Sequence, residues 1–208
     1  MKNDFNEKQI QILLIAETLF ADNGFEGTSI RTIAKEAKIN VAMVSYYFGS
    51  KEKLLEALII YRTSDLKIKI ENLSLENLNP IEKIDKLIEL YINRISCNKG
   101  IYRILHFEFS SEEKEDKLKV LNEVRDRNLK SIEAIIHEGQ EKGIFRKDVN
   151  IPLISPTIMG TFFHFIMNKT YFKKLLVLET DEQFDAYTQT TFKTHIQQTI
   201  KALLIYES

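Results

Sequence analysis

The sequence predicts an all-α protein in which an N-terminal domain of three short helices precedes a larger helical bundle. Only 7 Gly and 3 Pro occur in 208 residues, too few for many short strands with a turn every roughly 8 to 12 residues. Apolar residues instead recur at helical spacing along most of the chain. We expect the domain boundary near residue 50, with the smaller domain at 1–50 and the larger at 51–208.

Composition excludes several classes of protein. With 44% hydrophobic and 28% charged residues, the chain has the make-up of an ordinary globular protein. The single Cys97 rules out an internal disulfide framework and a multi-thiolate metal site. No apolar run approaches the roughly 18 residues of a membrane-spanning helix, and the start MKNDFNEKQ lacks the apolar part of a signal peptide. We therefore expect a cytoplasmic protein with no membrane partner.

The first expected helix covers residues 6–23. Asn6 precedes Gln9 by three positions, which is the capping-box pattern, and Gly24 supplies a left-handed stop. A second segment opens at Thr28 and carries one apolar stripe of about two turns. The stripe consists of Ile30, Ile33, Ala34 and Ala37.

A third short helix is expected from Val41 to Phe48, with Asn40 as its N-cap. Val44 and Phe48 lie one turn apart and can face the first two helices. A long fourth helix is expected to start at Lys51. The remaining side chains of the third helix are then left facing outwards.

Longer helices are expected in the rest of the chain. Gly100 separates one of them from an aromatic stretch, and a capping box of Ser110 and Glu113 opens another. Pro152 and Pro156 leave the start of the penultimate helix open, because a helix begun at the first would lose a backbone bond at the second. The expected ranges are 51–73, 80–97, 102–109, 110–142, 155–176 and 181–206.

Positive charge is concentrated near the N-terminus. Residues 27–53 hold five lysines and arginines against two glutamates, a net charge of +3, which leaves −4 for the rest of a chain whose total is −1. A near-neutral protein with one local basic stretch is no general polyanion binder. The basic stretch coincides with the second and third expected helices.

Two short helices joined by a tight turn, packed on a third and lying within a basic stretch, are typical of a helix-turn-helix DNA reader. The same arrangement is also a common packing unit, so the pattern alone leaves DNA binding open. More specific are Ala16, Leu19, Phe20, Gly24, Phe25, Thr28, Ser29, Ile30, Arg31, Ile33, Ala34, Ala37, Tyr47, Phe48, Ser50, Lys51 and Leu54. With these in register, residues 12–58 resemble the N-terminal domain of the TetR/AcrR family of bacterial transcriptional regulators.

The resemblance implies an N-terminal helix-turn-helix DNA-binding domain, with its motif at about 28–48, and a larger domain for effector binding and dimerisation. It implies a ligand-responsive repressor that binds a pseudo-palindromic double-stranded operator as a homodimer, with a small-molecule effector. By carry-over, Thr28, Tyr47 and Lys51 contact phosphates. The reading face comprises Val41, Ala42, Met43, Ser45 and Tyr46, joined by Asn40 if its side chain is free of the cap.

Three positions depart from the family pattern. Lys38 stands where the family usually has Gly, and positive φ there would cost a lysine about 1 kcal/mol. Ala42 replaces another frequent Gly and keeps access to the groove. Ser45 stands where Tyr is common, so the contact of that Tyr passes to Tyr46. We expect apolar contacts to thymine methyl groups and DNA shape to share the recognition.

Aromatic residues gather at two places in the larger domain. Such groups usually form core, but an effector pocket is also an apolar concavity with a few polar groups. The candidate pocket residues are Tyr91, Tyr102, His106, Phe107, Phe162, Phe163 and His164. The last two helices are long enough to pair in a dimer, and the same side chains can instead complete the protomer core. The candidate dimer residues are Phe165, Phe192, Ile196 and Leu203.

Other functions remain as alternatives. An activator or a corepressor-dependent regulator would carry the same domains, and a helical small-molecule or lipid carrier would keep the pocket without needing the basic stretch. The four histidines, at 106, 137, 164 and 195, form no close pair, which argues against a metal site. Without a phosphate loop, a nucleophile elbow or a base beside Cys97, we expect no catalytic residue, no cofactor and no enzyme.

Overall fold

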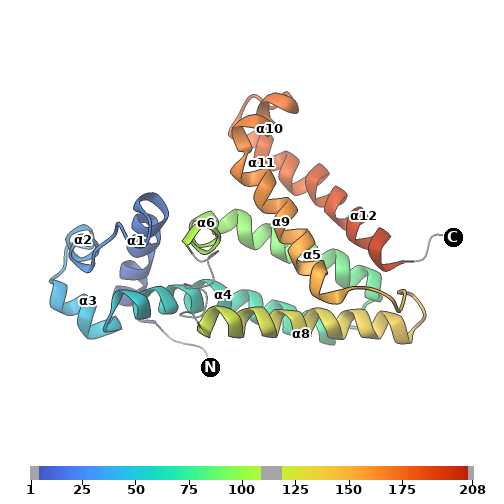
Figure 1. Ribbon diagram of the computed structural model, residues 1–208, viewed down its shortest axis with the longest axis horizontal. Helices are drawn as coiled ribbons and strands as arrows, with labels where there is room; N and C mark the ends of the chain where they lie inside the picture. Colours follow the sequence, from blue (N-terminus) through green and yellow to red (C-terminus); the bar gives the residue numbers. More distant parts are fainter. Residues whose placement is uncertain (1–4, 109–118, 206–208) are drawn as a thin grey trace. The chain divides into compact units, whose positions relative to one another are not determined.

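The computed structural model describes residues 5–108 and 119–205, and every regular element in these ranges is helical (Figure 1). The prediction of an all-α protein is therefore confirmed. The elements are α1 (Glu7–Asn23), α2 (Ile30–Glu36), α3 (Val41–Phe48), α4 (Lys51–Leu75), α5 (Pro80–Cys97), α6 (Lys99–Glu108), α8 (Lys119–Glu141), a 3₁₀ turn η1 (Ile151–Leu153), α9 (Ile154–Met167), α10 (Lys169–Leu175), α11 (Asp181–Tyr187), a π turn η2 (Thr188–Phe192) and α12 (Lys193–Leu204).

Two compact units divide the chain. Unit 1 comprises Met1–Lys67 and Cys97–Asp126, and unit 2 comprises Ile68–Ser96 and Arg127–Ser208. The predicted boundary at residue 50 coincides with the start of α4, whereas unit 1 follows that helix as far as Lys67 and also takes in α6.

The N-terminal helices α1, α2 and α3, at the blue end of the chain in Figure 1, begin where local capping directs them. Asn6 and Gln9 form the predicted capping box of α1, and Asn40 caps α3. Gly24 follows α1 at a φ of 77°, a value that glycine adopts without strain. Their buried side chains form the small core of this domain: Ile12, Leu13, Ala16, Phe20, Ile33, Ala34, Ala37, Val44 and Phe48.

Two predicted helix ends were wrong. The second helix does not open at Thr28: Ser29 is its N-cap, its side chain accepting the backbone N–H of Thr32, and α2 begins at Ile30. Gly100 does not separate two segments but lies in the first turn of α6. A Cβ at Gly100 would lie 3.0 Å from Oε1 of Glu17, so a close approach of α6 to α1 accounts for this glycine.

Unit 2 packs α5, α8 and the C-terminal helices around an aliphatic and aromatic core. The predicted capping box of Ser110 and Glu113 lies outside the described residues. Lys83 of α5 is buried and donates hydrogen bonds to Glu138 of α8 at 2.7 Å and to the carbonyl of Ser74 at 2.9 Å. Core side chains of the unit include Ile84, Leu87, Ile88, Ile132, Ile135, Ile136, Phe162, Phe165, Phe184, Phe192, Ile196, Ile200 and Leu204.

The structure resolves the ambiguity at the two prolines. Pro152 lies in the 3₁₀ turn, and Pro156 is the third residue of α9, within the first turn, where a backbone N–H has no helical partner to lose. The single helix predicted over 155–176 is instead broken at Asn168 into α9 and α10. The last predicted helix, 181–206, runs as α11, the π turn and α12.

Candidate DNA-binding surface

One side of α3 belongs to the core and the other faces outwards. Val44 and Phe48 are buried, as predicted, and α3 packs against α2. Tyr46 is 84% exposed, a large fraction for an aromatic residue. All five residues expected on the reading face are exposed: Val41, Ala42, Met43, Ser45 and Tyr46.

Asn40 uses its side chain to cap α3. Its Oδ1 accepts the backbone N–H of Ala42 at 2.9 Å. A bidentate contact to adenine needs both the oxygen and the nitrogen of an asparagine amide. The sequence prediction included Asn40 in the reading face only if its side chain was free of the cap. Because the side chain does cap α3, this condition is not met.

Thr28 is placed inside the domain rather than on its surface. The residue is 2% exposed, and its hydroxyl donates to the carbonyl of Gly24 at 2.9 Å and to that of Leu19 at 3.1 Å. The hydroxyl thus joins the turn after α1 to the end of that helix. Its contact with a phosphate stays a prediction, and the neighbouring Ser29 is the exposed hydroxyl at this point.

Lys51 is also engaged within the protein. Its Nζ donates to the carbonyl of Phe25 at 3.0 Å, lies 4.3 Å from the centroid of the Phe25 ring and approaches Glu26 at 3.8 Å. The first residue of α4 therefore fastens the turn between α1 and α2. Tyr47, the third predicted phosphate contact, is half-buried, with its ring centroid 5.4 Å from that of Tyr46.

Four other basic residues near α3 have solvent-exposed side chains: Arg31, Lys35, Lys38 and Lys53. Within the described residues these side chains form no ion pair. These four cations were not among the DNA contacts predicted from the sequence. The net charge of +3 over residues 27–53 was the signal that could have identified them. Lys38 has a φ of 53°, so this lysine does occupy a left-handed position.

The predicted effector residues do not gather around one described cavity. In unit 2, Tyr91 and Phe162 are core residues, Phe163 is half-buried and His164 is exposed; in unit 1, Tyr102 is buried and His106 exposed. The side chain of Phe107 lies outside the described part of the chain. Their role as pocket residues stays a prediction.

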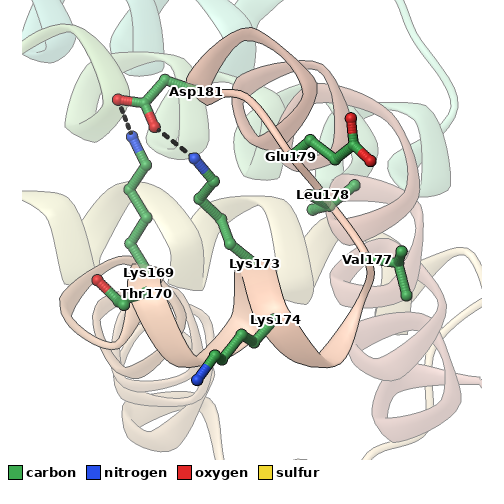
Figure 2. A pocket seen from close by; sticks show the side chains of 8 residues that line it. All are labelled: Lys169, Thr170, Lys173, Lys174, Val177, Leu178, Glu179 and Asp181. Carbon is green, nitrogen blue, oxygen red and sulfur yellow. Dashed lines mark hydrogen bonds and ion pairs between the residues drawn. The ribbon is translucent and has the colours of Figure 1, made fainter.

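The described hollow is elsewhere, between α10 and the start of α11 (Figure 2). It has a volume of about 580 Å³ and none of the predicted residues lines it. Asp181 lies between two lysines, 2.8 Å from Lys169 and 2.9 Å from Lys173, while Lys174 points away from it (Figure 2). Hydrogen bonds from Lys169 and then Lys173 lower the pKa of Asp181 from 3.8 to about 2.

The candidate dimer residues divide into two groups. Phe165, Phe192 and Ile196 are buried within the protomer, where the Phe165 ring stacks on that of Phe192 at 4.4 Å. They complete the core of unit 2 and have little surface left for a partner, whereas Leu203 is 45% exposed. The sequence missed seven further exposed large apolar residues in the described part of this unit: Ile68, Leu75, Leu153, Met167, Tyr171, Leu175 and Val177.

Neither a metal site nor a membrane-spanning helix is found in the part of the chain that the structure describes. No group of three or more His, Cys, Asp or Glu side chains there is placed to hold a metal ion. No described helix combines the length and the apolar character needed to cross a membrane.

Comparison with known proteins agrees with this geometry. A family model described as bacterial regulatory proteins of the tetR family matches residues 12–58, and one described as the tetracyclin repressor-like C-terminal domain matches residues 80–200. The transcriptional repressor NicS of Pseudomonas putida is 27% identical over 185 residues, which cover 84% of each chain.

Solved structures share the fold over nearly the whole chain. The fatty acid degradation regulator FadR of Bacillus halodurans superposes with a TM-score of 0.78 at 21% identity, covering 96% of this chain and 97% of that one. FadR of Bacillus subtilis, solved with stearoyl-CoA, gives 0.73 at 19% identity, covering 93% and 97%. The two family models together match residues 12–58 and 80–200, from α1 to α12, and this chain belongs to the TetR family of bacterial transcriptional regulators.

Proposed function

We propose that the protein is a ligand-responsive transcriptional repressor that binds a pseudo-palindromic operator as a homodimer. The observation that carries the proposal is the outward face of α3, on which the large side chains Val41, Met43 and Tyr46 are exposed. Large apolar side chains at the surface of a short helix favour a partner surface. In this family that partner is operator DNA.

Recognition by α3 combines two kinds of contact. The helix enters the major groove, where Val41, Ala42 and Met43 suit thymine methyl groups and Tyr46 reaches a base edge or the sugar-phosphate backbone. Phosphates are bound by the exposed cations around it, Arg31 and Lys53 among them, which set register without reading sequence. Two such helices about 34 to 36 Å apart match successive turns of one face of the duplex.

The homodimer is assigned to unit 2. Six of the eight exposed large apolar residues in its described part lie between Leu153 and Leu203, and paired helices of two protomers would bury these six in a four-helix arrangement. Leu203 remains the candidate from the sequence, since Phe165, Phe192 and Ile196 are already buried. Size-exclusion chromatography with light scattering tests the assignment: Leu203→Asp together with Met167→Asp should yield monomer.

As effector we infer a long-chain acyl-CoA. Support comes from the similar fatty acid regulators, one of them solved with stearoyl-CoA. Because binding is linked, an effector that weakens operator binding must itself bind less tightly to the DNA complex, by the same factor. We expect stearoyl-CoA to release the protein from the operator and CoA alone to have no effect. If neither compound releases it, acyl-CoA thioesters are not the effector.

The decisive experiment is a gel shift on the DNA upstream of the protein's own gene, with a salt titration. We expect a retarded complex whose affinity falls steeply with salt, and a loss of retardation for a Met43→Asp, Tyr46→Asp variant that leaves the core intact. No retardation of any fragment at low salt would contradict DNA binding. Stronger binding when an effector is added would favour the corepressor alternative, and raised transcription from the bound promoter would favour an activator. NicS and the two FadR proteins are transcriptional regulators, and the comparisons give no support to the carrier hypothesis.

A further inference from the structure

Glu17 connects three helices of unit 1. It lies on α1, is 5% exposed, and its Oε2 accepts hydrogen bonds from both Nε and Nη2 of Arg62 on α4, the first at 2.8 Å. Its Oε1 accepts the backbone N–H of Ile101, in the first turn of α6, at 2.9 Å. A single buried carboxylate therefore uses both of its oxygens on two other helices.

The two contacts suit a carboxylate for physical reasons. The first backbone N–H groups of a helix have no partner within it and carry partial positive charge, so an acid from another helix can cap them. The guanidinium neutralises the charge, which would otherwise be costly to bury. Arg62 is held in turn, since its guanidinium carbon lies 5.5 Å from the centroid of the Tyr61 ring.

The approach of α6 to this carboxylate is close. A Cβ at Gly100 would come within 3.0 Å of Oε1 and 3.1 Å of Cγ of Glu17, a separation that needs one side to move. The glycine in the first turn of α6 thus allows the helix end to rest directly on α1. Glu17, Arg62 and Gly100 all lie outside the outward face of α3.

Both helices that Glu17 binds are next to segments of unit 2 in the chain. Helix α4 leaves unit 1 after Lys67, and α6 begins just after the chain re-enters unit 1 at Cys97. The contacts of this carboxylate therefore form a direct route by which a displacement of either helix reaches α1. Helix α1 in turn packs against α2, which packs against α3.

We propose that Glu17 is a positioning residue for DNA binding, which holds α1 at a fixed orientation to α4 and α6 and so sets the spacing of the two recognition helices in the dimer. The proposal rests on the proposed function, because spacing has meaning only for a dimer on two half-sites. Loss of the contacts would leave the domain of α1, α2 and α3 folded in each protomer, but its orientation relative to α4 and α6 would vary.

Half-site spacing is the property to measure. An operator is first selected from random double-stranded DNA on the wild-type protein, and variants with one or two base pairs inserted between its half-sites are then made. We expect the wild-type protein to prefer the selected spacing, and Glu17→Gln to reduce that preference by about fivefold or more, within the range of typical coupling between sites. Gln cannot accept from Arg62 and Ile101 at once, because one end of its amide is a donor.

Two further variants separate positioning from folding. Glu26→Gln removes the acid of the ion pair with Lys51, in the same unit but without a bond to α6, and should keep the spacing preference. Glu17→Leu with Arg62→Met replaces the buried ion pair by apolar side chains, an exchange that folded proteins often tolerate. This double variant replaces Glu17→Gln if that protein does not fold. It should bind operators of all three spacings nearly equally, as a dimer of unchanged mass.

Each result bears on the proposal. An unchanged preference in a folded Glu17 variant would overturn it, as would equal losses of affinity on all spacings or a wild-type protein that ignores spacing. If the wild-type protein binds no DNA at low salt, the proposed function itself has failed. Faster hydrogen exchange at the Ile101 amide in the variants would accompany the expected loss of preference and would identify the broken contact.

Discussion

The Nζ of Lys51 lies 4.3 Å from the centroid of the Phe25 ring and donates a hydrogen bond of 3.0 Å to the carbonyl oxygen of the same residue. The lysine that opens α4 is therefore built into the turn that separates α1 from α2. Its side chain is 19% exposed, which leaves a limited surface for a phosphate.

Lys51→Ala should affect both stability and DNA binding. Removal of the cation–π contact and of a charge-assisted hydrogen bond should lower the free energy of unfolding by about 1 to 3 kcal/mol. Loss of a phosphate contact should weaken binding to all sequences and reduce the salt slope by about one unit. Urea denaturation and anisotropy titrations at several salt concentrations measure the two effects. An unchanged slope would remove Lys51 from the phosphate contacts. Lys53→Ala is the control for stability, because the exposed Lys53 should lower the slope without lowering the free energy of unfolding.

Thr28→Val tests a buried hydroxyl. Valine has nearly the same shape but cannot donate to the carbonyls of Leu19 and Gly24, so the free energy of unfolding should fall by about 1 to 3 kcal/mol. Since the hydroxyl is turned inwards, we expect the folded variant to bind the operator with nearly unchanged affinity. Weaker binding with full stability would show instead that this hydroxyl binds a phosphate.

Lys38→Gly should stabilise the protein. The φ of 53° at Lys38 costs a residue with a Cβ about 1 kcal/mol, which glycine largely avoids. The same change removes a positive charge near the DNA, so affinity should fall as stability rises. Lys38→Ala separates the two effects, because alanine keeps the strain and loses only the charge. Equal stability of the Gly and Ala variants would contradict the backbone explanation.

Tyr46→Ala should separate recognition from folding. The side chain is 84% exposed, so we expect a change in unfolding free energy within about 0.5 kcal/mol. Operator binding should weaken by about 1 to 3 kcal/mol, with a much smaller loss on unrelated DNA. Anisotropy measurements on both DNA molecules give the ratio. Equal losses on the two would assign Tyr46 to the phosphate backbone, and Tyr46→Phe reports whether its hydroxyl takes part.

Asp181 should make a pH-dependent contribution to stability. Lys169 and Lys173 lower its pKa from 3.8 to about 2, so the folded state favours the ionised carboxyl. The stabilisation is therefore complete above about pH 4 and is lost as the pH falls through about 2. The difference in urea midpoint between the wild-type protein and Asp181→Asn should shrink over that window. A difference that stays constant with pH would contradict the ion pairs, and Glu179→Gln is a control in the same hollow.

Local patterns in the sequence were enough to predict much of the DNA-binding domain. The caps at Asn6 and Asn40 and the anchors Val44 and Phe48 depend on neighbours within one turn, and the structure has each of them as expected. The outward face of α3 follows from the same periodicity, because side chains opposite a buried stripe must be exposed. Family resemblance added the partner, which no local pattern names.

Contacts between distant residues were decided only when the helices had packed. Thr28 turns inwards because the carbonyls of Leu19 and Gly24 are close to it, and Gly100 lies inside a helix because α6 meets Glu17, 83 positions earlier in the chain. Phe165, Phe192 and Ile196 entered the protomer core because α9, η2 and α12 close on one another. Helical periodicity states which face of a segment is apolar, but the neighbour that covers the face is chosen by packing over the whole chain.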